Sequence, residues 1–149
     1  MRPIRDALEL LTAQHEDIEF LIVQVQQTYD SDAFDELSDT LVSHLALEQE
    51  LFYPAVACAM SAEIRRELLE EHLAIKRVLA ELVWLGVEDR DFGAKMRELA
   101  YLLDGHCGYQ EEQLFEAVAE ALPSEQLTSL CAELKSFDLL GSRTSAKAA

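Results

Sequence analysis

Four long segments of the chain carry apolar residues at every third or fourth position, and this pattern constrains the fold most. The spacing brings these residues onto one face of an α-helix, so each segment predicts a helix that buries one stripe. The segments lie at about residues 8–29, 34–60, 62–85 and 91–122. Short connections make consecutive helices antiparallel neighbours. We therefore predict an all-α fold, an up-down-up-down four-helix bundle over residues 1–122.

Each predicted helix holds one histidine at a stripe position where leucine would be expected. They are His15, His44, His72 and His106, the only histidines among 149 residues. With a rise of 1.5 Å per residue, they lie roughly 15 to 24 Å from the same end of the bundle, which is a similar depth. Burying imidazole costs stability unless its nitrogens find partners, and a metal ion would supply them. The pattern predicts one metal site across the core.

Two of the histidines are followed by a carboxylate. Glu48 comes four residues after His44, and Glu111 comes five residues after His106. Residues four apart on a helix are about 40° apart around its axis, so Glu48 faces the same way as His44. Mixed histidine and carboxylate ligation suits iron, manganese or zinc.

Glu111 requires a departure from regular helix, because five residues correspond to about 140°. Continuing the stripe regularly from His106 would bury Gln110, whereas skipping one residue would bury Glu111 and a more apolar set beyond it. A π-bulge produces such a skip, and π-bulges are frequent at functional sites. We predict a bulge that turns Glu111 towards the site.

Charge and cysteine content restrict the possible partners. Lys and Arg total 12 against 29 Asp and Glu, a formal charge of -17, so nucleic acid and anionic membranes would be repelled. Three cysteines without a CxxC pair favour a reducing compartment, and no segment reads as a signal peptide or membrane span. The sequence predicts a cytoplasmic protein. Cys107 is about 100° around the helix from His106, so we expect it to pack aside rather than take part in chemistry.

Pro123 ends the fourth predicted helix. The apolar residues that follow predict a short fifth helix at residues 123–140, packed on the bundle or against a partner subunit. Residues 141–149 are small and polar, and we expect them to form a disordered tail.

The chain resembles the haemerythrin-like, or HHE cation-binding, proteins over roughly its first 120 residues. These proteins similarly have a lone histidine, then His-x3-Glu, then a histidine on the third helix, then His-x4-Asp. The matching residues here are His15, the string from His44 to Pro54, the pair Glu71-His72, and the string from His106 to Phe115.

The resemblance implies a non-haem di-iron centre with two bridging carboxylates and an oxo or hydroxo bridge. The implied metal ligands are His15 and His44 for one iron, His72 and His106 for the other, and Glu48 and Glu111 as bridges. An oxygen-binding haemerythrin would have another histidine where this chain has Lys76. This departure leaves the second iron open and argues against reversible oxygen carriage. Glu19 is a spare carboxylate that would compensate, and Glu71 and Glu112 are weaker spares.

Three functions fit these residues. The first is a protein that binds or senses a small ligand such as oxygen or nitric oxide, or responds to iron or peroxide. The second is a di-iron enzyme that reduces peroxide or oxygen. The third is a regulatory or structural bundle that holds zinc or no metal. A signal would need self-association into a homo-oligomer or an unidentified protein partner, because no output domain is recognisable.

Overall fold

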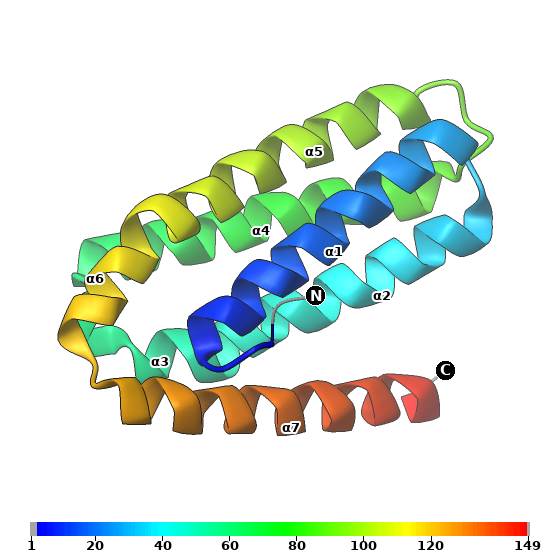
Figure 1. The fold of residues 1–149 in the computed structure, drawn as a ribbon. Coiled ribbons are helices and arrows are strands. Elements are labelled where there is room, and N and C mark those ends of the chain that lie inside the picture. The colour runs from blue at the N-terminus through cyan, green and yellow to red at the C-terminus, as the bar shows by residue number, and fades with distance from the viewer. Residues whose placement is uncertain (1–2, 149) are drawn as a thin grey trace.

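Four long helices form the body of the protein (Figure 1). They are α1 (Ala7–Thr28), α2 (Ser31–Leu47), α4 (Ala62–Leu85) and α5 (Phe92–Tyr109). The computed structural model describes residues 3–148, and for residues 138–148 it describes the backbone alone. The predicted all-α four-helix bundle is confirmed, and the described residues contain no strand. No described helix combines the length and the apolar character needed to cross a lipid bilayer.

Two of the four helices change pitch along their length. α2 passes through the π-helical turn η1 (Glu48–Phe52) into α3 (Tyr53–Ala55) and the 3-10 turn η2 (Ala57–Ala59), and α5 passes through the π-helical turn η3 (Gln110–Leu114) into α6 (Phe115–Ala121). A π-turn adds a residue to the helical repeat, so the face that points inward changes along the helix. Both π-turns lie next to histidines of the predicted site.

The helix ends follow from the residues that occupy them. The side chains of Asp6, Asp30 and Ser61 each accept a hydrogen bond from a backbone amide three residues later, and so cap α1, α2 and α4. Gly86 ends α4 with a φ of 81°, a value that glycine adopts without strain. These caps fix where each helix begins and therefore the depth of its histidine.

The buried side chains form two apolar clusters, separated by the histidines. One cluster lies towards the α1–α2 connection and includes Leu37, Leu82 and Phe92. The other lies towards η1 and α6 and includes Phe52 and Val118. Burying one such side chain contributes about 1.5–3 kcal/mol, so these clusters supply most of the driving force for folding. The histidines form a polar layer between two apolar ones.

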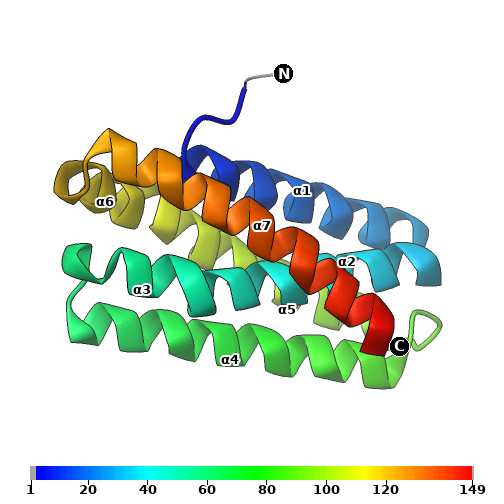
Figure 2. The same cartoon turned by 90° about the horizontal axis from the view of Figure 1, so that it is seen from below.

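Helix α7 (Ser124–Ala148) lies along the bundle against α1 and α2 (Figure 2). Leu127, Leu130 and Leu134 are buried in the second cluster. The helix is longer than the one predicted for residues 123–140, and its backbone continues through most of the segment expected to be a disordered tail. Extending an existing helix is far easier than starting one, and the final residues include alanine and lysine, which favour helix.

Candidate metal centre

The structure brings the four histidines together around one carboxylate, Glu48. The Nε2 atoms of His44, His72 and His106 lie 3.4, 3.1 and 3.2 Å from Glu48 Oε1. His15 Nε2 lies 4.0 Å from Glu48 Oε2. All five residues are at most 5% exposed. Helices α1, α2, α4 and α5 therefore each contribute one histidine, and the turn η1 contributes Glu48, to a single buried cluster.

The ligand atoms divide into two groups that share Glu48. The first group is His15, His44 and Glu48, and the second is Glu48, His72 and His106. Within each group the ligand atoms lie within 4.8 Å of one another. Each group has the composition of a site for a first-row transition metal, with imidazole nitrogen and carboxylate oxygen. A shared carboxylate between them is suited to bridging two ions.

Three of the four imidazoles are held by a hydrogen bond at Nδ1. The acceptors are Glu111 Oε2 for His15 at 3.1 Å, Gln14 Oε1 for His44 at 2.7 Å, and Glu71 Oε1 for His106 at 2.9 Å. An Nδ1 that donates to an oxygen fixes the orientation of the ring and increases the basicity of Nε2. Each Nε2 is thereby aimed at the shared carboxylate, as in histidine ligands of known metal sites.

The first group contains buried polar atoms that have no protein partner. They are His15 Nε2, His44 Nε2 and Glu48 Oε2. An unpaired buried polar atom costs about 1–3 kcal/mol, so three at one point are unusual unless a ligand satisfies them. The second group adds His72 Nδ1 and, close by, Gln110 Oε1. The residues of the first group therefore fit a bound cation, because it would accept all three lone pairs.

The charges in the cluster depend on one another. Burial alone would raise the pKa of Glu48, but His44, His106 and His15 outweigh it and hold that pKa well below its usual range. Burial lowers the pKa of His44. At neutral pH the cluster therefore contains an ionised Glu48 and a neutral His44.

Two other histidines hold protons tightly. Burial opposes the charged form of His15, but the neighbouring Cys107 and Glu48 outweigh burial and raise its pKa to about 10. Burial likewise opposes the charged form of His106, whereas Glu48 and Glu71 raise its pKa to about 9. A cation that binds these imidazoles must displace their protons.

The second group is covered by a buried tyrosine and glutamine. The Tyr53 hydroxyl lies 3.1 Å from His72 Nε2, and Gln110 Nε2 donates a hydrogen bond to that hydroxyl at 2.6 Å. Both side chains are fully buried. Lys76 is exposed to solvent. The His72 nitrogen that faces Glu48 is therefore also in contact with Tyr53.

Glu111, which was predicted to face the metal site with His106, belongs to neither group of ligand atoms. The predicted π-turn exists, but it begins at Gln110, which is the buried residue. Buried positions then recur every four residues from His106 through Gln110 to Leu114, so the extra residue is accommodated beyond Gln110. The Glu111 side chain is 38% exposed and contacts His15 Nδ1 from outside the ring of ligands.

The structure also places Cys107 and the three spare carboxylates, Glu19, Glu71 and Glu112. Cys107 lies beside His15 rather than turned away from the site. Glu19 and Glu112 are exposed, whereas Glu71 is the hydrogen-bond partner of His106. Gln14 was not predicted as a site residue, although it directly precedes His15 in the sequence.

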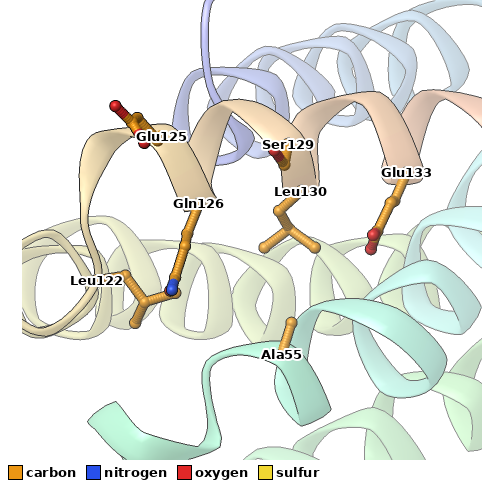
Figure 3. Close-up of a pocket in the computed structure, with 7 residues that line it drawn as sticks. All are labelled: Ala55, Leu122, Glu125, Gln126, Ser129, Leu130 and Glu133. Carbon is orange, nitrogen blue, oxygen red and sulfur yellow. The ribbon is translucent and has the colours of Figure 1, made fainter.

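A groove between α1 and α5 reaches the cluster from solvent. It has a volume of about 600 Å³, and its lining includes His15, Cys107, Gly108 and Glu111. A separate cavity of about 410 Å³ lies between Ala55 and the first turns of α7 (Figure 3). None of the predicted metal ligands lines that second cavity. The groove is therefore the cavity that relates to the metal centre.

Comparison with known proteins agrees with this geometry. The hemerythrin HHE cation-binding domain matches residues 6–118. A protein named DNA nickase, from Nostoc sp. (strain PCC 7120 / SAG 25.82 / UTEX 2576), is 26% identical over 131 residues. The match covers 85% of this chain but only 37% of that protein. No solved structure gives a significant match.

Proposed function

Because this chain belongs to the haemerythrin HHE cation-binding domain family, we propose that it holds two iron ions around Glu48 and uses them to bind or sense a small ligand. The ligand would be oxygen, nitric oxide or peroxide, or the signal would be the iron supply itself. His15 and His44 would hold one ion, and His72 and His106 the other. Glu48 would bridge them.

The observation that carries this proposal is the set of unpartnered atoms His15 Nε2, His44 Nε2 and Glu48 Oε2. A purely structural polar layer would be expected to pair its atoms with one another, since unpaired buried groups destabilise the fold. Nδ1 partners on three rings also orient Nε2 inward, as metal ligation requires. A bundle without metal explains neither feature.

The protein's own residues would prepare the centre in distinct ways. Glu71 and Gln14 orient the imidazoles of His106 and His44. The two apolar clusters on either side exclude water. Iron in such a site would supply reversible redox chemistry and an affinity for diatomic molecules, whereas zinc would supply neither.

Elemental analysis of the protein purified after growth in iron tests the proposal. We expect two iron ions per chain and a near-ultraviolet to visible absorption that changes with dithionite and with oxygen. Glu48→Gln is the test variant, and Glu50→Gln is its matched control, because Glu50 lies in the same π-turn but is exposed. Less than one iron per chain in the unaltered protein would refute the proposal. Stoichiometric zinc would instead favour the structural bundle, and sustained peroxide turnover would favour the enzyme.

We propose that this chain does not act on DNA, although the Nostoc relative is named DNA nickase. DNA carries dense negative charge, and the formal charge of -17 here would oppose binding to it. We propose instead that the protein works in a reducing, cytoplasmic compartment, since its three cysteines are free. An output would then pass through self-association or a partner protein.

A further inference from the structure

We infer that the groove between α1 and α5 is the access route by which a divalent cation reaches the group formed by His15, His44 and Glu48. The inference rests on the proposed function only in requiring that this group takes up a cation. Of the four histidines, only His15 lines the groove, and its Nε2 is a buried atom without a partner. The groove therefore leads from solvent to one residue of this group, His15.

The approach to the cluster beside His72 is closed by packed side chains. Tyr53 and Gln110 are fully buried, hydrogen bonded to each other, and placed against His72. A cation entering there would have to displace a fully buried aromatic ring. By contrast, the lining of the groove includes two small residues, Cys107 and Gly108.

The charge along the groove suits a cation. Four carboxylates line it, those of Glu16, Glu19, Asp104 and Glu111, and no lysine or arginine does. A cleft lined by one sign of charge concentrates oppositely charged ions and increases their rate of association. Two carboxylates come from each side, so the negative potential extends across the groove between α1 and α5.

Glu111 connects the outer part of the groove with the buried ligands. Its side chain is 38% exposed, yet Oε2 lies 3.1 Å from His15 Nδ1. The carboxylate thus contacts solvent and a metal-ligating imidazole at the same time. A cation drawn in by the outer carboxylates would meet Glu111 before it meets His15. In this structure Glu111 is therefore placed to deliver the cation.

Two glycines of α5 provide a matched test of the route. A Cβ added at Gly108 or at Gly105 meets no heavy atom within 4 Å, so either position accepts a side chain. Gly108 lines the groove and Gly105 does not. Both substitutions remove a glycine from the same helix, so they change helix propensity alike.

The experiment measures Co²⁺ uptake by the full chain, stripped of metal, in a stopped-flow spectrometer. We expect Gly108→Leu to slow both Co²⁺ uptake and its removal by EDTA at least about threefold, because the side chain obstructs the groove. Gly105→Leu should follow the unaltered protein. Final Co²⁺ content should be the same in all three, because no ligand has been changed. Equal rates in the two leucine variants would overturn the inference.

A charge test is independent of the obstruction. Glu19→Gln with Asp104→Asn should slow uptake about three- to tenfold at low salt and reduce its salt dependence. The control is Glu36→Gln with Asp39→Asn, which makes the same charge change at exposed positions of α2. Equal slowing by both pairs would show that net charge, not the groove, sets the rate, and would overturn the inference. Failure of the unaltered protein to bind Co²⁺ would refute the proposed function as well.

Discussion

Binding of a divalent cation to the metal-free protein should release protons. The protonation states of the ligands determine how many protons are released. Metal ligation requires neutral imidazole. His15 and His106, with pKa values of about 10 and 9, are protonated at pH 7. Glu48 is already ionised and His44 already neutral, so neither has a proton to lose. We therefore expect about two protons per chain from these two histidines.

The affinity for a divalent cation should depend on pH, because binding displaces protons. Each displaced proton changes the binding free energy by about 1.4 kcal/mol per pH unit. Two protons give about 2.7 kcal/mol, so affinity should rise about 100-fold between pH 7 and pH 8. Above pH 10 both histidines have lost their protons in the metal-free protein, and the dependence should level off.

Titration calorimetry with Zn²⁺, in buffers of different ionisation enthalpy, measures the proton count directly. The matched variants are Glu71→Gln and Glu70→Gln. Glu71 accepts a hydrogen bond from His106 and helps to raise its pKa, whereas Glu70 is an exposed neighbour that pairs with Arg66. At pH 8 the count should fall in Glu71→Gln and stay near two in Glu70→Gln.

Two results would refute this account. Release of fewer than one proton per chain at pH 7 would show that His15 and His106 are neutral in the metal-free protein. Identical counts in the two variants at pH 8 would show that Glu71 does not stabilise the proton on His106.

Four further outcomes follow from the geometry. The stability that His15 and His106 contribute to the metal-free protein should be fully present just below pH 6.5 and be lost towards pH 10, because their raised pKa values favour folding only while the imidazoles are protonated; chemical denaturation from pH 6.5 to pH 10 checks the sign. Lys76→Ala should leave metal content unchanged and shift the free energy of unfolding by less than about 0.5 kcal/mol, since Lys76 is exposed, and a loss of metal would contradict its placement. Tyr53→Phe should cost about 1–3 kcal/mol because the buried Gln110 amide loses its acceptor, and an unchanged melting temperature would contradict that hydrogen bond. Leu134→Ala should cost about 2–5 kcal/mol if α7 is part of the core, and urea denaturation that shows no change would mean that α7 docks only weakly.

Helical periodicity was sufficient to predict the bundle because four segments bury a single stripe each. It also identified the four histidines and Glu48, since a polar residue inside an apolar stripe is visible without coordinates. The layer they form follows from helix rise alone. These features depend on the spacing along one helix at a time, which the sequence contains.

The register beyond His106 could not be settled in the same way. Gln110 and Glu111 are neighbours, and which of them is buried depends on where the π-turn begins. That choice is stabilised by Tyr53, which accepts a hydrogen bond from Gln110 and comes from another helix. Contacts between helices also decide the partners of Nδ1, so Glu71 and Gln14 had no periodic signal. Likewise, composition predicted a helix that ends at residue 140, whereas the backbone of α7 continues as a helix beyond it.

The two π-turns make the protein sensitive to the length of the chain at two points. Each turn adds one residue, and a residue corresponds to about 100° around a helix axis. Deleting one residue from η3 would restore a regular helix, yet it would rotate α6, with Phe115 and Val118, away from the second cluster. The same holds for η1 and Tyr53. Substitutions in these turns change one side chain, whereas a single deletion would change which face of the rest of the helix meets the core.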